Sequence, residues 1–228
     1  MPIDKIVPSV AEAVSGISSG MTIMISGFGF AGVPNDLIQG VLDLGATDLT
    51  VISNNAGTGT DGLAALIGSG RVRRIICSYP RSKGSDLFDA RYAAGEIELE
   101  LVPQGTLSER MRAAGAGIGG FFTPTGAGTE LAAGKEIRMI DGREYVLETP
   151  LRADVALVQA QAADRWGNLV YAKAGRNFGP VMAMAADLTV VQVREIVPLG
   201  LLDPEVIVTP SIFVDRVTLM DNEREWDI

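Results

Sequence analysis

Short apolar runs alternate with amphipathic segments along most of the chain. The runs are rich in β-branched residues, which is typical of buried strands. They lie at residues 21–25, 49–52, 72–78, 97–101, 155–160, 188–193 and 212–214. Other segments place apolar residues on one helical face, and these lie at residues 10–17, 34–42, 63–67, 85–94, 107–114 and 180–186. This order predicts an α/β fold with an open, mainly parallel sheet and helices on both faces.

Local signals mark where some of these elements begin. Ser9 followed by Glu12 forms a capping box, which predicts the start of the first helix. Pro34 fits the first turn of the second helix, because an N–H at that place would have no partner. Residues 97–101 alternate apolar side chains with glutamates, which predicts a strand with one solvated face.

The alternation breaks at residues 115–150, which hold many glycines. Residues 135–140 and 143–148 flank Asp141-Gly142, a strong signal for a hairpin turn. We therefore expect a small β-hairpin excursion near residues 135–148. Because no linker or repeat is visible elsewhere, a single domain over residues 1–228 is the simplest prediction.

Composition argues against several kinds of active site. The 228 residues include no histidine and one cysteine, and 19 Lys and Arg against 28 Asp and Glu give a net charge of −9. This composition excludes a Ser-His-Asp triad, a histidine metal site, a zinc cluster and an internal disulfide. We therefore expect no metal and a reducing, cytoplasmic location. A pI of about 4.6 without a basic run argues against nucleic acid, and no signal peptide or membrane-spanning run is visible.

A glycine loop follows the first predicted strand. Gly27, Gly29 and Gly32 fit the pattern G-x-G-x-x-G between a strand and a helix. Bare backbone N–H groups at such a place favour an anionic group. A nicotinamide cofactor also needs an acidic residue after the second strand, but residues 53–55 read Ser-Asn-Asn. Phosphate or acyl binding therefore remains open, and so does a plain tight turn.

Three amides and one arginine follow other predicted strands. Asn54, Asn55 and Gln104 offer N–H donors to a carbonyl oxygen or a developing oxyanion. Arg81 has the fork geometry that binds a carboxylate through two hydrogen bonds. Because the carboxyl ends of parallel strands meet at one rim, these residues are candidates for one site. The alternatives are turn-forming asparagines, a loop glutamine and a surface arginine.

The chain offers no convincing nucleophile or base. Cys77 lies in an apolar run without an activating neighbour in sequence, so we interpret it as a buried structural cysteine. The glutamates of residues 96–100 are interpreted as solvated. The residues alone therefore leave two possibilities, a binding module or an enzyme whose catalysis depends on another chain.

Taken together, several segments resemble the A (alpha) subunit of family I coenzyme A transferases. The resemblance runs from about Met21 to about Arg216. Its segments are GFGFAGVP at 27–34, ISNNAG at 52–57, LVPQGTLSERMRAAGAGI at 101–118, FFTPTGAGT at 121–129, DRWGNLVY at 164–171 and GRNFGP at 175–180. Ser19 and Ser26 depart from the family's first signature. Within the family, CSYPRS at 77–82 and NFGPVMAMAA at 177–186 are most similar to the 3-oxoadipate:succinyl-CoA type.

The resemblance implies how the work is divided between two different chains. The acyl-CoA thioester is attacked by a glutamate of the B (beta) subunit, which later carries coenzyme A as a glutamyl thioester. No catalytic residue is then expected in this chain, which would act in a hetero-oligomer. A coenzyme A thioester is a substrate, and no permanently bound cofactor is implied.

The resemblance also implies roles for residues of this chain. Ser26, Gly27, Phe28, Gly29, Phe30, Ala31 and Gly32 would lie against coenzyme A or acyl groups. Asn54, Asn55 and Gln104 would orient the carbonyl, and Arg81 would bind the second carboxylate of 3-oxoadipate. The alternatives are one chain of an acetate- or acetoacetate-type transferase, and a non-catalytic α/β domain that binds a sugar phosphate or nucleotide.

Overall fold

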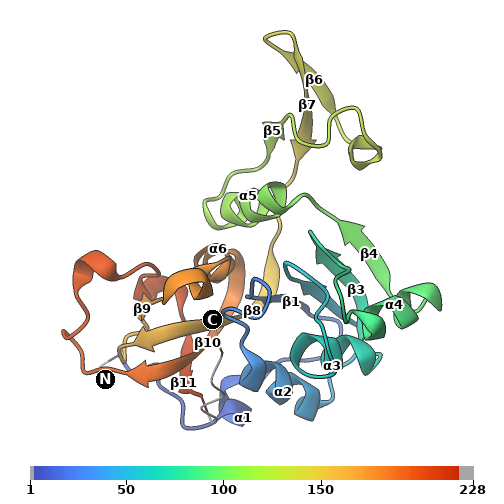
Figure 1. The fold of residues 1–228 in the computed structure, drawn as a ribbon. Coiled ribbons are helices and arrows are strands. Elements are labelled where there is room, and N and C mark those ends of the chain that lie inside the picture. Colours follow the sequence, from blue (N-terminus) through green and yellow to red (C-terminus); the bar gives the residue numbers. More distant parts are fainter. Residues whose placement is uncertain (1–2, 221–228) are drawn as a thin grey trace.

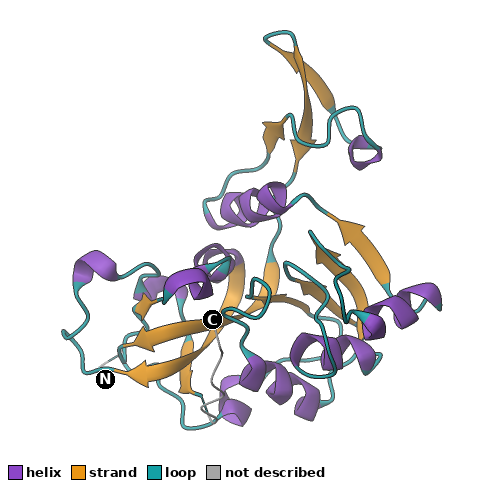
Figure 2. Ribbon diagram, viewed as in Figure 1, coloured by secondary structure: helices purple, strands orange, loops and turns teal. Residues whose placement is uncertain are grey.

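A twisted, mainly parallel sheet forms the body of the molecule (Figures 1 and 2). The computed structural model describes residues 3–220. The strand order is β11-β10-β8-β1-β2-β3-β4, and the short β9 pairs antiparallel with β8. The strands are β1 (Thr22–Ile25), β2 (Leu49–Ile52), β3 (Val72–Cys77), β4 (Glu98–Leu101), β8 (Ala153–Ala163), β9 (Leu169–Val170), β10 (Ala186–Ile196) and β11 (Arg216–Leu219). The predicted α/β class is confirmed.

Helices cover both faces of the sheet, as predicted. One hydrophobic cluster joins the sheet to α1, α2, α3 and α4, and a second joins the opposite face to α5 and α6. The helices are α1 (Val10–Ala13), α2 (Asn35–Leu44), α3 (Gly62–Gly68), α4 (Asp86–Ala93), α5 (Gln104–Gly115) and α6 (Gly179–Ala185). None of the helices within residues 3–220 is long and apolar enough to cross a membrane.

The two helix starts predicted from local signals are correct to within one residue. The Ser9 side chain accepts a hydrogen bond from the Glu12 N–H, although α1 has only one turn. Pro34 is the N-cap residue of α2 and not its first helical residue, and it has no side-chain acceptor to offer. Gln192 of β10 supplies that acceptor instead, because its Oε1 accepts from the N–H groups of Asp36 and Leu37 at 3.1 Å each.

Residues 121–148 extend away from the sheet as a small arm (Figure 1). The predicted hairpin is present as β6 (Ile137–Ile140) and β7 (Arg143–Glu148), with Asp141 and Gly142 both at positive φ in the turn. A third strand, β5 (Phe121–Thr123), pairs antiparallel with β7 and was not predicted. Short 3₁₀ turns lie at Glu130–Ala132, Lys173–Arg176, Pro204–Val206 and Ser211–Phe213.

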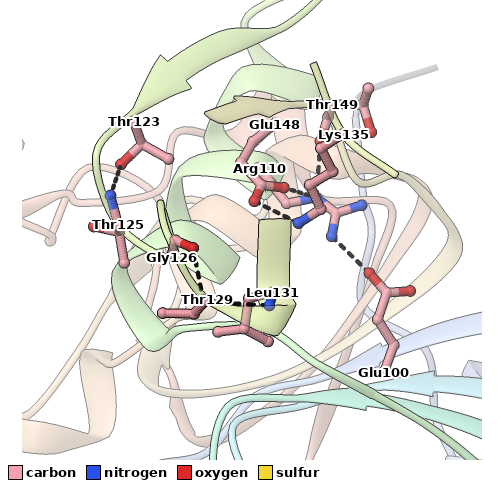
Figure 3. A network of polar contacts seen from close by, with 10 residues as sticks. All are labelled: Glu100, Arg110, Thr123, Thr125, Gly126, Thr129, Leu131, Lys135, Glu148 and Thr149. Atoms are coloured by element: carbon pink, nitrogen blue, oxygen red, sulfur yellow. Dashed lines mark hydrogen bonds and ion pairs between the residues drawn. The ribbon is translucent and has the colours of Figure 1, made fainter. Parts of the chain in front are cut away.

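Buried ion pairs anchor the arm to the body (Figure 3). Arg110 of α5 lies between Glu148 of the arm and Glu100 of β4. Its Nη1 donates to Glu100 at 2.8 Å and its Nε donates to the Thr149 carbonyl at 2.8 Å. Lys135 donates to Glu148 at 2.6 Å, and the Glu148 side chain is only 4% exposed. The arm is therefore fixed where it leaves the sheet.

Two expectations about strands were wrong. Residues 211–213 form a 3₁₀ turn, and the last strand lies later, at Arg216–Leu219. Glu100 is not on a freely solvated face, because it binds Arg74 and Arg110, and Leu101 is 45% exposed instead. Both departures occur at edge strands, where burial constrains the pattern on one side only. The single domain over residues 1–228 stays a prediction, since it includes residues outside those described.

The strand order reverses between β1 and β8. From β1 the chain moves outward through β2, β3 and β4, and it later returns to place β8 on the other side of β1. In open parallel sheets, ligands bind at the carboxyl ends of the strands beside such a reversal. The glycine loop follows β1 at this position.

Candidate active site

A cavity of about 140 Å³ lies beside the carboxyl ends of β1 and β2. The glycine loop forms one wall, and residues that follow β2 form the other. The lining residues are Ile25, Ser26, Gly27, Gly29, Phe30, Val33, Asn35, Ser53, Asn55, Gly57, Thr58, Asp61, Gly62 and Leu63. The sequence predicted both walls at this rim, and the structure brings them together.

The glycine loop is a tight turn with two exposed aromatic rings. Phe28 and Ala31 exchange backbone hydrogen bonds of 3.0 and 3.1 Å. Gly32 has φ +70, and a Cβ there would lie 2.5 Å from the Gly175 carbonyl oxygen, so a side chain is excluded. Phe28 and Phe30 are 50% and 68% exposed. The turn therefore presents apolar surface at a cavity that also has amide and backbone groups in its lining.

Asn177 holds this loop from a distant part of the chain. Its Oδ1 accepts from the Gly27 N–H at 2.9 Å, and its Nδ2 donates to the carbonyls of Ala31 and Gly175 at 3.2 and 2.9 Å. Its own φ is +25, an uncommon value for a residue other than glycine. Asn177 lies in the GRNFGP segment of the family resemblance, but spacing alone does not reveal this contact.

Ser26 lies at the start of the glycine loop and forms a hydrogen bond with its other end. Its hydroxyl donates to the Gly32 carbonyl at 2.7 Å and accepts from the Gln159 N–H at 3.2 Å. The side chain is 1% exposed. Ser26 therefore joins the two ends of the loop and ties the loop to β8, and it also belongs to the cavity lining.

The two adjacent asparagines point to opposite sides of the sheet. Ser53 and Asn55 line the cavity, whereas Asn54 is 6% exposed and lies outside it. The alternation of side chains along a strand continues past the end of β2 and explains this division. The Asn55 Oδ1 accepts from the Gly57 N–H at 2.8 Å, which leaves its amide N–H groups available to a ligand.

Asn54 and Gln104 meet on the α5 side. The Asn54 Oδ1 accepts from the Gln104 Nε2 at 2.7 Å and from the Ser78 hydroxyl at 2.8 Å. Gln104 is the first residue of α5, which begins earlier than the helix predicted at residues 107–114. The structure therefore groups Asn54 with Gln104, and it groups Asn55 with the glycine loop. Ser78 is an addition that the sequence did not single out.

Arg81 and Cys77 have structural partners. The Arg81 Nε donates to Asp89 at 2.6 Å, and its guanidinium lies 5.5 Å from the centre of the Tyr92 ring, so it faces α4 and does not line the cavity. Burial raises the pKa of the Cys77 thiol to about 12, despite a hydrogen bond with the Tyr79 backbone. A thiol of that pKa stays protonated, which agrees with the structural interpretation.

The cavity has polar donors but few acids. Of the residues that line it, Asp61 is the only carboxylate, and none is a glutamate. Within residues 3–220, no group of three or more His, Cys, Asp or Glu side chains is placed to hold a metal ion. The arrangement can orient and polarise a carbonyl group, but the lining residues offer no glutamate as nucleophile.

Comparisons with known proteins agree with this geometry. Residues 7–219 match the family described as Coenzyme A transferase. The chain is 61% identical to the A chain of 3-oxoadipate CoA-transferase from Pseudomonas putida, over 94% of this chain and 93% of that protein. It is 57% identical to the protein of the same name from Acinetobacter baylyi, over 94% of each chain. The fold matches the crystal structure of glutaconate coenzyme A-transferase from Acidaminococcus fermentans with a TM-score of 0.81 and 24% identity, over 94% of this chain and 75% of that chain.

Proposed function

The chain belongs to the coenzyme A transferase family, and from this premise we propose that it is the alpha component of a 3-oxoadipate:succinyl-CoA transferase. The reaction moves coenzyme A from succinyl-CoA to 3-oxoadipate and releases succinate. Two relatives named for 3-oxoadipate, at 61% and 57% identity over nearly the whole chain, support this choice of acid. The proposal replaces the alternative of a non-catalytic nucleotide-binding domain.

The chemistry requires a second kind of chain. The thioester carbonyl is attacked by a glutamate carboxylate of the B subunit, and the coenzyme A thiolate leaves as an acyl-glutamyl anhydride forms. The thiolate then attacks the glutamyl carbonyl, which releases succinate and forms a glutamyl-CoA thioester. The reverse sequence with 3-oxoadipate regenerates the carboxylate. The observation that supports this division is a cavity lined with amide and backbone donors but without a glutamate.

This chain shapes and polarises its half of the pocket. Residues 26–32 lie against the acyl or coenzyme A group, and the exposed rings of Phe28 and Phe30 offer it apolar surface. The Asn55 amide donates to the carbonyl oxygen as negative charge develops on it. Asn54 and Gln104 stabilise the adjoining rim and orient the acid from the α5 side. The enzyme needs no resident cofactor, and the single buried cysteine suits a reducing cytoplasm.

The test is reconstitution of the two-subunit enzyme. The purified chain is assayed alone and after mixing with the B subunit that accompanies the Pseudomonas putida relative, with succinyl-CoA and 3-oxoadipate as substrates. We expect transfer only from the mixture. Intact-mass spectrometry after incubation with succinyl-CoA should find the coenzyme A adduct on the B subunit. Transfer by the chain alone, or an adduct on this chain, would contradict the proposal.

A further inference from the structure

A second, smaller cavity lies on the other side of the glycine loop. Its volume is about 50 Å³, whereas about 10–15 Å³ is enough for one water molecule, so a carboxylate group fits. Gly27, Gly29 and Phe30 belong to the first cavity, and Ala31 and Gly32 belong to the second. The other lining residues are Gln159, Ala160, Gln161, Tyr171, Ala172, Gly175 and Arg194. None of these residues is acidic.

Arg194 is an uncompensated positive charge at this cavity. Among residues 3–220 its side chain forms no hydrogen bond or ion pair, in contrast to that of Arg81, which is bound to Asp89. Strands β8 and β10 are paired in register on either side of it, with Val193 opposite Ala160 and Glu195 opposite Ala162. Arg194 therefore lies beside Gln161, and parallel pairing directs both side chains to the same face of the sheet.

Gln159 adds a buried polar group without a partner. It lines the same cavity, is 8% exposed, and its Oε1 has no hydrogen bond. A buried amide without a partner is costly, so a ligand or water that bonds to it is favoured. Rotation of the amide about its last bond presents N–H donors to an anion in place of the oxygen. Tyr171 also lines the cavity, and burial raises its pKa to about 12 despite its hydrogen bond with Thr209, so it stays neutral.

We propose that Arg194, assisted by Gln161, binds the distal carboxylate of the dicarboxylic acids and selects them over monocarboxylic 3-oxoacids. This inference rests on the proposed function. An arginine fork suits a carboxylate, and the loop that separates the two cavities places this site next to the one for the reacting carbonyl. Arg194 thereby takes the role that the sequence suggested for Arg81.

The test compares two acids of the same length in the reconstituted two-subunit enzyme. 3-Oxoadipate carries the distal carboxylate, and 3-oxohexanoate has a methyl group in its place. Arg194→Gln should lower kcat/KM for 3-oxoadipate roughly 10- to 100-fold, the usual effect of losing a hydrogen bond to a charged group. Its kcat/KM for 3-oxohexanoate should stay within about twofold, since that acid lacks the charged partner. Arg194→Lys should recover part of the loss, because it restores the charge without the fork.

Arg143→Gln is the matched control, because Arg143 is an exposed arginine at the start of β7 in the arm, which extends away from the sheet (Figure 1). It should leave kcat/KM unchanged for both acids. An equal loss for both acids in Arg194→Gln, or a loss specific to 3-oxoadipate in Arg81→Gln alone, would overturn the inference. A wild-type complex that does not transfer coenzyme A to 3-oxoadipate would instead refute the proposed function. The two failures are therefore distinguishable.

Discussion

Asn55 shows how a single side chain can serve both the fold and the chemistry. Its Oδ1 accepts the Gly57 N–H and so fixes the turn, while its nitrogen remains free for a ligand in the cavity. The two halves of one amide therefore have separate tasks. A substitution that keeps the oxygen and removes the nitrogen separates these tasks.

Asn55→Asp is such a substitution. We expect kcat to fall about 10²- to 10³-fold, the usual loss when one oxyanion donor is removed. The turn should survive, because the new carboxylate still accepts from Gly57. Steady-state kinetics of the two-subunit enzyme give kcat, and urea unfolding of the chain checks the fold. A kcat within about threefold of wild type, with a normal unfolding curve, would exclude Asn55 as a donor.

Asn177 supports a second prediction at this scale. In Asn177→Ala the Gly27 N–H and the carbonyls of Ala31 and Gly175 lose their partner, so we expect about 1–3 kcal/mol less stability. The looser glycine loop should also raise KM for the acyl-CoA. Asn177→Asp keeps the acceptor for Gly27 but turns a carboxylate oxygen towards the carbonyls of Ala31 and Gly175, so it should be at least as destabilised as Asn177→Ala. Equal unfolding midpoints for wild type, Asn177→Ala and Asn177→Asp would show that the hydrogen bonds of Asn177 contribute nothing to stability.

At the scale of whole elements, the ion pairs of Figure 3 join an arm, a helix and an edge strand. Burial alone would raise the pKa of Glu100, but hydrogen bonds and charges from Arg110 and Arg74 outweigh it, so its pKa lies below the usual value. A carboxyl group whose pKa is lowered by folding stabilises the folded state at pH values above its unfolded pKa. That stabilisation is lost as the pH falls through the folded pKa.

Acid unfolding tests this network. Glu100→Gln should lower the free energy of unfolding at pH 7 by about 1–2 kcal/mol, because two charged hydrogen-bonded contacts are weakened. The difference from wild type should shrink as the pH falls from about 5 towards 3, measured by urea unfolding at each pH. Glu98→Gln is the control on the same strand. Within residues 3–220 the Glu98 carboxylate has one ion pair, with Arg73 at 3.8 Å, so its loss should cost less than about 0.5 kcal/mol. If the difference in unfolding free energy between wild type and Glu100→Gln stays constant with pH, the lowered pKa of Glu100 is contradicted.

The elements also show what a sequence can predict. Strands in the centre of the sheet, such as β1 and β2, were predicted almost to the residue, because burial on both faces demands a continuous apolar run. Strand β5 was not predicted, because its three residues form a strand only through pairing with β7, which lies more than twenty residues later in the chain. The order of the chain also determined which loops meet at the carboxyl rim.

Prediction of the site from the sequence was also limited to residues whose position along the chain is informative. Position along the chain indicated the glycine loop and Asn55, which share the cavity. Asn177 and Arg194 could not be found in this way, because each acts on the loop or its cavity from more than a hundred residues away. The sequence interpretation placed Asn54 and Asn55 in one site. It did not take into account that successive side chains along a strand point to opposite faces of the sheet.

At the scale of the whole molecule, the carboxyl rim of the sheet has the features of an uncovered interface. It combines cavities that carry polar groups with the exposed rings of Phe28 and Phe30. Exposed aromatic side chains next to polar groups are typical of a surface that another protein covers. The opposite rim, where residues 69–71 lead into β3, has no such combination among the cavity-lining residues. The B subunit is therefore expected to close on the carboxyl rim.

Hydrogen exchange of the chain, alone and in the two-subunit complex, tests this placement. Amide protons of residues 26–33 and 53–59 should exchange at least about tenfold more slowly in the complex, because both segments become enclosed. Residues 69–71 lie at the amino ends of the strands and serve as the internal control, which should not change. Catalysis by a partner's glutamate needs that carboxylate within bonding reach of the thioester, so the boundary must cross the cavity. Protection at residues 69–71 with none at the glycine loop would place the partner elsewhere and refute a shared pocket.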